Sequence, residues 1–138
     1  MDNATKSEFI KVWRALRCKA SCKSVKPYKV YTALLTQSGT DAPVATVLEN
    51  TIGGGDAIYS RDTTGEYTVI FGVDIFTSPN AYVFISFPGA TDTSIGAAPI
   101  YFNAIGISTF SGGVNSDDVL GPFGISPTPT ILEIRLYN

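Results

Sequence analysis

From Tyr28 onward, apolar and polar positions alternate in short runs, and each run ends in a cluster of turn-forming residues. Tyr28–Thr36 is rich in β-branched and aromatic residues, residues 37–43 are polar, and Val44–Leu48 is a second apolar run. Three glycines, Gly53–Gly55, then interrupt the chain. This arrangement predicts two strands joined by a turn, because β-branched runs favour strands and Gly, Pro, Asn and Asp favour turns.

The middle of the chain repeats this pattern. Ala57–Arg61 and Glu66–Phe71 flank a short polar turn and predict a hairpin in which Gly65 takes the left-handed conformation. Ala81–Phe87 is apolar at almost every position, and a strand that is apolar on both faces is expected at the centre of a sheet.

The C-terminal part contains shorter candidate strands, Ile100–Phe102 and Ile105–Phe110. Residues 111–130 are rich in glycine and proline, which predicts a long loop with a short strand near Val119–Leu120. The last segment, Ile131–Tyr137, alternates apolar and charged residues, as a strand with one buried face does.

About seven or eight strands therefore follow one another, and no helical pattern separates them to carry parallel crossovers. The sequence predicts an all-β domain over residues 28–138, an antiparallel β-sandwich or jelly roll whose C-terminal strand lies inside a sheet. A small β-barrel is the alternative.

Residues 1–27 have a different pattern and form a separate basic arm. Thr5 and Glu8 fit a capping box, and apolar side chains recur at helical spacing, which predicts an amphipathic helix over about residues 6–19. Its apolar stripe consists of Phe9, Val12, Trp13 and Leu16, and its basic side chains include Lys11, Arg14 and Arg17.

Charge is divided sharply between the two parts of the chain. Residues 1–29 hold eight Lys and Arg against two Asp and Glu, a net +6, whereas residues 30–138 hold two against ten, a net −8. Three interpretations of the arm follow: it packs on its own β domain, it docks on an acidic partner or nucleic acid, or it lies on a membrane surface. Our working hypothesis is that the arm docks on an acidic partner or nucleic acid, and the membrane surface is the weakest of the three interpretations. The candidate partner-binding residues are therefore those of the apolar stripe and the basic side chains beside it: Phe9, Lys11, Val12, Trp13, Arg14, Leu16 and Arg17.

The reactive side chains exclude several classes of enzyme. The chain has no histidine, so Ser-His-Asp and Cys-His catalysis and histidine-ligated zinc are excluded. Cys18 and Cys22 are expected to be free thiols in a reducing compartment, with a redox or metal role as the minor alternative. No apolar leader segment is present at the N-terminus, which predicts synthesis in the host cytoplasm.

Other chemistry-bearing residues have ordinary explanations that outweigh a site. Asp117 and Asp118 could bind calcium from a flexible loop, but solvated loop carboxylates are commoner. We therefore predict no catalytic residues, no cofactor and no metal. The weaker candidates are the carboxylates of Glu49, Asp62, Glu66 and Asp74 for glycoside cleavage, and the rings of Tyr59, Tyr67, Tyr82 and Tyr101 for sugar stacking.

The segment Tyr28–Gly55, the turn Thr64–Tyr67 and the terminal Leu132–Tyr137 resemble a group of small β-rich accessory proteins of tailed bacteriophages. The resemblance covers less than half of the chain and supplies no site residues. It implies a virion protein such as a capsid decoration, head fibre or tail component. The expected function is thus non-enzymatic and structural, in a homo-oligomer (a trimer among the candidates) bound to other virion proteins. A carbohydrate-binding module for host attachment is the alternative.

Overall fold

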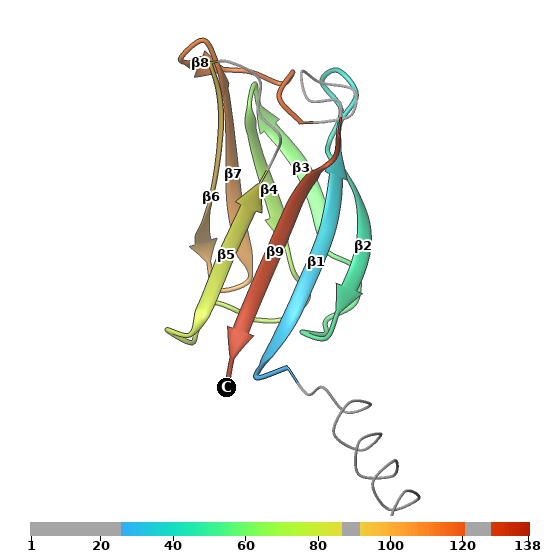
Figure 1. Ribbon diagram of the computed structural model, residues 1–138, viewed down its shortest axis with the longest axis vertical. Helices are drawn as coiled ribbons and strands as arrows, with labels where there is room; N and C mark the ends of the chain where they lie inside the picture. Colours follow the sequence, from blue (N-terminus) through green and yellow to red (C-terminus); the bar gives the residue numbers. More distant parts are fainter. Residues whose placement is uncertain (1–25, 87–91, 121–127) are drawn as a thin grey trace, which may run out of the picture.

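The described residues from Tyr28 onward lie mostly in short antiparallel strands, as the alternating pattern predicts (Figure 1). The computed structural model describes residues 26–86, 92–120 and 128–138, and these contain strands, turns and loops but no helix. The strands are β1 (Tyr28–Thr36), β2 (Val44–Asn50), β3 (Ile58–Thr63), β4 (Glu66–Ile70), β5 (Ala81–Ser86), β6 (Thr93–Tyr101), β7 (Ala104–Ser111), β8 (Val114–Asn115) and β9 (Thr130–Tyr137).

The strands form two sheets that lie one behind the other in Figure 1. The front sheet has the order β2-β1-β9-β5, and the back sheet has the order β3-β4-β7-β6 with the short β8 paired to β7. Every strand pair is antiparallel. The two sheets remain separate and keep edge strands, so the barrel alternative is not the fold of this two-sheet body.

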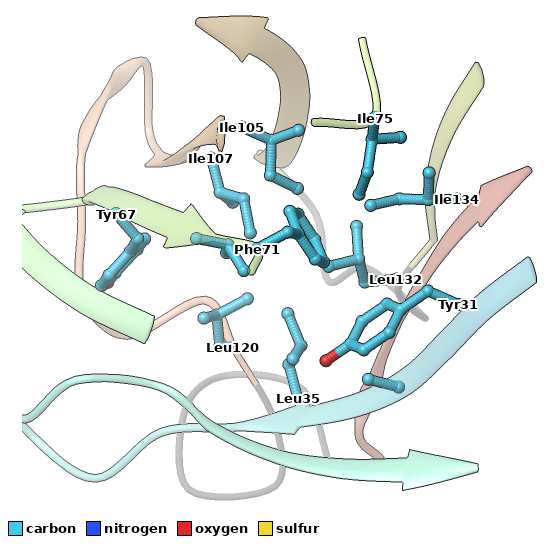
Figure 2. Close-up of a cluster of buried hydrophobic side chains, with 12 residues drawn as sticks. Tyr31, Leu35, Tyr67, Phe71, Ile75, Ile105, Ile107, Leu120, Leu132 and Ile134 are labelled. Carbon is cyan, nitrogen blue, oxygen red and sulfur yellow. The ribbon is translucent and has the colours of Figure 1, made fainter. Parts of the chain in front are cut away.

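The core lies between the sheets, because alternate residues of each strand point inward (Figure 2). On β1 the inward side chains Tyr31, Ala33 and Leu35 are almost fully buried, while their neighbours Thr32 and Leu34 are only half-buried. Burying one large apolar side chain contributes about 1.5–3 kcal/mol. The buried cluster draws on both sheets and their loops: Tyr31, Ala33, Leu35, Tyr67, Val69, Phe71, Ile75, Ile105, Ile107, Leu120, Leu132 and Ile134.

Two predictions from the pattern are confirmed. Gly65 has a φ of 68° in the turn between β3 and β4, the left-handed conformation that glycine adopts without a steric penalty. The C-terminal strand β9 lies between β1 and β5, with Leu132 and Ile134 buried and Glu133 turned to the outer face.

The prediction that Ala81–Phe87 is a central strand is wrong. Residues 81–86 of this segment form β5, which is an edge strand of the front sheet. Its outward side chains Tyr82 and Phe84 are about half exposed. Apolar residues on both faces therefore reflect an apolar outer surface of the sheet rather than a position at its centre.

The strand expected near Val119–Leu120 is also absent. Both side chains are fully buried, and Leu120 belongs to the core, but they lie in a loop because no neighbouring strand pairs with them. The short strand of this region is β8, at Val114–Asn115. The expected strand Ile100–Phe102 is the end of β6 and the turn after it.

Residues 1–25 of the basic arm, with the predicted helix at residues 6–19 and with Cys18 and Cys22, lie outside the described residues. Within the described ranges, the chain has no helix of the length and apolar character that crossing a membrane requires.

Candidate functional site

Charged and aromatic side chains share the outer face of the front sheet. Since Leu132 and Ile134 of β9 point into the core, Glu133 and Arg135 point outward. Arg135 is paired across the sheet with Tyr82 of β5, and Glu133 is paired with Phe84. The alternation of β9 thus places a cation and an anion beside two exposed rings.

Arg135 is held in place by aromatic rings on both neighbouring strands. Its guanidinium carbon Cζ lies 4.9 Å from the ring centroid of Tyr28 and 5.0 Å from that of Phe84. Its Nε donates a hydrogen bond to the carboxylate of Glu133. Hydrogen bonding to Tyr137 and Glu133 raises the pKa of Arg135 further, so this group remains a cation. Cation–π contacts of this kind orient a guanidinium without neutralising its charge.

A shallow hollow of about 520 Å³ lies beside this stack and is lined by Asn80, Tyr82, Phe84 and Tyr137. The ring of Tyr137 meets Tyr82 edge to face at 5.8 Å and lies 5.1 Å from Tyr28. An apolar floor with a polar amide at its rim could stack on a flat ring and hydrogen-bond to its substituents.

The outer face of the back sheet carries a different feature, an apolar row across four strands. Ile58 is paired with Ile70, Ile70 with Ala104, and Ala104 with Tyr101. Directly paired residues project from the same face of a sheet, and the adjacent Val69 and Ile105 are in the core. The apolar row (Ile58, Ile70, Ala104 and Tyr101) therefore lies on the outer face at the end where β1 begins, the lower end of Figure 1. Ile58, Ile70 and Tyr101 are exposed there, whereas the small Ala104 between them is covered and only 2% exposed.

The apolar row leads into a hollow at the turn between β6 and β7. This lower hollow has a volume of about 550 Å³ and is walled largely by apolar side chains. The connection between β4 and β5 holds this turn in place, because the carbonyl of Phe102 accepts hydrogen bonds of 2.7 Å from Ile75 N and 2.8 Å from Phe76 N. The side chain of Phe102 nevertheless stays exposed. The lining consists of Asp74, Phe76, Pro99, Ile100, Tyr101, Phe102 and Asn103.

The charges near the apolar row are negative. Asp56 precedes β3, Asp74 lines the lower hollow, and both are exposed. Neither forms an ion pair within the described residues. The cations Arg61 and Arg135 are instead bound to Asp117 and to Glu133.

A partly buried polar network lies at the opposite, upper end of the body. The carboxylate of Asp117 accepts hydrogen bonds from Arg61 Nη2 at 2.8 Å, from Gly65 N at 2.9 Å and from the hydroxyl of Tyr67 at 2.8 Å. The same hydroxyl lies 2.9 Å from Gln37 Oε1. The Arg61 guanidinium, with the bonds from Gly65 and Tyr67, lowers the pKa of Asp117 to about 2.

This network has a structural role, because it joins the loop after β8 to the turn between β3 and β4. It also changes the interpretation of Asp117, which is neither a solvated loop carboxylate nor a free oxygen ligand for calcium. In the described part of the chain, no three His, Cys, Asp or Glu side chains are grouped to hold a metal ion.

The four carboxylates considered for glycoside cleavage lie on different elements, and three of them serve local contacts. Glu49, on β2 of the front sheet, forms an ion pair with Lys26, in which Oε2 lies 2.6 Å from Nζ. Asp62 accepts hydrogen bonds from Ser60 and Thr68 on the back sheet. Glu66 binds Ser108 and Asn115, and Asp74 lies in the connection between β4 and β5.

The four candidate tyrosines divide into two groups. Tyr67 is fully buried, and the hydroxyl of Tyr59 is bonded at 2.8 Å to that of Tyr31, so neither ring is free to stack on a ligand. Tyr82 and Tyr101 are exposed, on opposite outer faces of the body. Arg135 and Phe84 were not among the candidate site residues predicted from the sequence. The alternating pattern of β9 was the signal that Arg135 faces outward, whereas the almost wholly apolar segment around Phe84 gave no such signal.

Comparisons with protein families, with curated proteins and with solved structures found no match to this chain. The function must therefore be inferred from the aromatic face of the front sheet and from the apolar row with its lower hollow.

Proposed function

We propose that the protein is a non-enzymatic structural component of a virus particle. In this proposal, residues 1–27 anchor the chain to the assembly through the predicted helix at residues 6–19. The two-sheet body is a β-sandwich that packs against further copies or is displayed on the particle. The observation that carries the proposal is the gathering of large exposed apolar side chains into ordered surfaces.

These surfaces occupy three parts of the body. The apolar row covers the lower end of the back sheet, aromatic rings cover the outer face of the front sheet, and the edge strand β2 exposes Val44 and Leu48. Contiguous exposed apolar area is uncommon on monomeric proteins and is typical of interaction surfaces. An edge strand with exposed valine and leucine is likewise suited to pairing with another chain.

The division of charge supports an anchoring role for the arm. Residues 1–29 carry a net +6 and the rest of the chain a net −8. Opposite charges on two parts of one chain favour contacts between copies over long range and orient the encounter. Packaged nucleic acid is the second target of a basic arm, and its binding would weaken steeply with salt.

The test uses the full chain and particles of the virus that encodes it. We expect the chain to sediment with the particles and a variant carrying Lys11→Gln, Arg14→Gln and Arg17→Gln to remain in the supernatant. The matched control is Lys29→Gln, which removes a cation from the start of β1 rather than from the arm. Failure of the unmodified chain to join particles would overturn the proposal.

The aromatic hollow of the front sheet favours a second candidate function, carbohydrate binding for host attachment. Tyr82 and Phe84 are exposed, and Tyr137 and the polar side chain of Asn80 line the hollow beside them. Aromatic faces bind the apolar faces of sugar rings, while amides and hydroxyls hydrogen-bond to their substituents.

A glycan array tests this alternative. We expect a binding signal from the full chain that is lost in Tyr82→Ala and kept in Tyr101→Ala, which changes an even more exposed tyrosine on the other face. An array without any signal would remove the alternative and leave the structural proposal intact.

A further inference from the structure

We infer that the apolar row and the lower hollow receive the basic arm of a second copy of this chain, over residues 5–19. The inference rests on the proposed assembly role and names the partner of the arm.

The two surfaces have matching apolar features. The arm presents a stripe of Phe9, Val12, Trp13 and Leu16 if it is helical, as its spacing predicts. The receiving surface is a row one residue wide that ends in a hollow of about 550 Å³. An amphipathic helix binds a groove through one large anchor and its neighbours at helical spacing. Trp13 is the largest side chain of the stripe and is the anchor that we assign to the lower hollow.

The charges on the two surfaces are opposite. Lys11, Arg14 and Arg17 lie outside the apolar stripe of the arm. The exposed carboxylates of Asp56 and Asp74 lie beside the apolar row and the hollow. Such pairs at the rim of an interface steer association and fix its orientation, and their effect weakens as salt screens them.

The position of Lys26 favours a second copy over the chain's own body. Lys26 Nζ donates to Glu49 Oε2 at 2.6 Å. Glu49 is paired with Thr32, whose neighbours Tyr31 and Ala33 point into the core, so this contact lies on the outer face of the front sheet. The apolar row is on the outer face of the opposite sheet.

The link between the arm and Lys26 is short. Residues 20–25 can span at most about 20 Å when fully extended. The apolar row lies at the lower end of the body, where β1 begins. An arm that starts outside the front sheet must therefore turn around this end, across two sheets that pack about 10 Å apart, before it reaches the row on its own body. The same arm meets no such obstacle when a second copy offers its back sheet. Contacts of this kind join different surfaces of two copies, so they close into a ring or extend into a filament.

Trp13 reports directly on this contact because it is the chain's one tryptophan. We expect its fluorescence to shift to shorter wavelength as the concentration of the full chain rises, since docking removes the indole from water. A shift that is already complete at the lowest concentration and does not depend on concentration would mean that the arm binds its own body, and would overturn the inference. The absence of a shift at every concentration would overturn it too.

Substitutions in the row identify the receiving surface. Ile58→Asp with Tyr101→Asp changes side chains that are 66% and 70% exposed, so the core is untouched. We expect this row variant to self-associate at least about tenfold more weakly, equivalent to about 1.4 kcal/mol. The matched control is Val114→Asp, 67% exposed on β8 at the upper end, which should change the affinity less than about twofold. Equal effects of the two would overturn the inference.

A mixing experiment separates the two halves of the contact. The arm variant Val12→Asp with Leu16→Asp keeps its row, and the row variant keeps its arm. Each alone should remain monomeric in sedimentation velocity, while the mixture should form a complex of one copy of each. A mixture that stays monomeric would overturn the inference.

This outcome is distinct from failure of the proposed function. If the row variant still sediments with virus particles as the unmodified chain does, the arm binds another component: the assembly role stands and docking between copies is wrong. If the unmodified chain neither self-associates nor joins particles, both proposals fail.

Discussion

The hydroxyl of Tyr67 donates a 2.8 Å hydrogen bond to the carboxylate of Asp117, fifty positions later in the chain. This bond joins a fully buried residue of β4 to the loop that follows β8. The same loop then places Val119 and Leu120 in the interior. A polar contact at the upper end of the body thus fixes the loop that completes the core.

Replacing Asp117 by Asn should lower the free energy of unfolding at neutral pH by about 1–2 kcal/mol, because a hydrogen-bonded charge pair is lost. The pKa of Asp117 falls to about 2 in the folded chain, from 3.8. A lowered carboxyl pKa contributes stability above the unfolded value, and this contribution disappears as the pH falls toward about 2. The difference between the two chains should therefore shrink in acid. Urea unfolding at several pH values measures it, with the exposed Asp118→Asn as the control.

Replacing Tyr67 by Phe should destabilise the body by about 1–2 kcal/mol at neutral pH, since Gln37 and Asp117 each lose a partner. Burial, and then the hydrogen bond to Asp117, raise the pKa of Tyr67 to about 12. The unfolded chain releases this proton near pH 10, so the unmodified protein should lose stability between about pH 10 and 12. The Phe variant should lose less over that range. Thermal unfolding in alkaline buffers measures this difference, with Tyr101→Phe as the exposed control. An equal fall of the melting temperature with pH for the unmodified protein and the Tyr67 variant would contradict the prediction.

Gly72 cannot be replaced by alanine without a shift of the backbone. A Cβ atom at this position would lie 2.0 Å from the carbonyl oxygen of Gly54, in the loop after β2. Gly72→Ala should cost about 1–3 kcal/mol or more, as overpacked substitutions do. Gly96→Ala is the matched control, because nothing lies within 4 Å of its added Cβ. Similar midpoints of chemical unfolding for the two variants would show that the close approach is absent.

Leu120→Ala should destabilise the body by about 2–5 kcal/mol, the usual cost of a cavity in a core. Leu120 is fully buried although it lies in a loop. Val114→Ala, at an exposed position of β8, should change the unfolding free energy by less than about 0.5 kcal/mol. A Leu120 variant as stable as that control would mean that the loop does not contribute to the core.

The order of apolar and polar residues was sufficient to predict the strands whose outer faces are polar. Ile131–Tyr137 is the clearest case, because Glu133 and Arg135 identify the outer face of β9 directly. The glycine at position 65, between two apolar runs, likewise predicted a turn with a left-handed residue, and Gly65 has that conformation. These features depend on residues close together in the sequence, and local chemistry determines them.

The errors arose where neighbours in space determine the outcome. Ala81–Phe87 was placed at the centre of a sheet because its outward Tyr82 and Phe84 suggested cover on both sides. β6 was largely missed because Gly96, Ala97 and Ala98 have low strand preference, and pairing with β7 forms the strand nonetheless. The apolar row could not be predicted, since Ile58, Ile70 and Tyr101 are brought together only by the register of four strands.

The position of β9 also constrains how the chain folds. β1 and β5 have no hydrogen-bonded contact with each other, and within the front sheet they are joined only through β9. Until residues 130–137 have left the ribosome, β1 can pair only with β2, and β5 has no partner in its sheet. Pairings between strands this distant in sequence form slowly. The front sheet therefore closes only after synthesis of its final strand, and interrupted translation would leave two apolar strands open to aggregation.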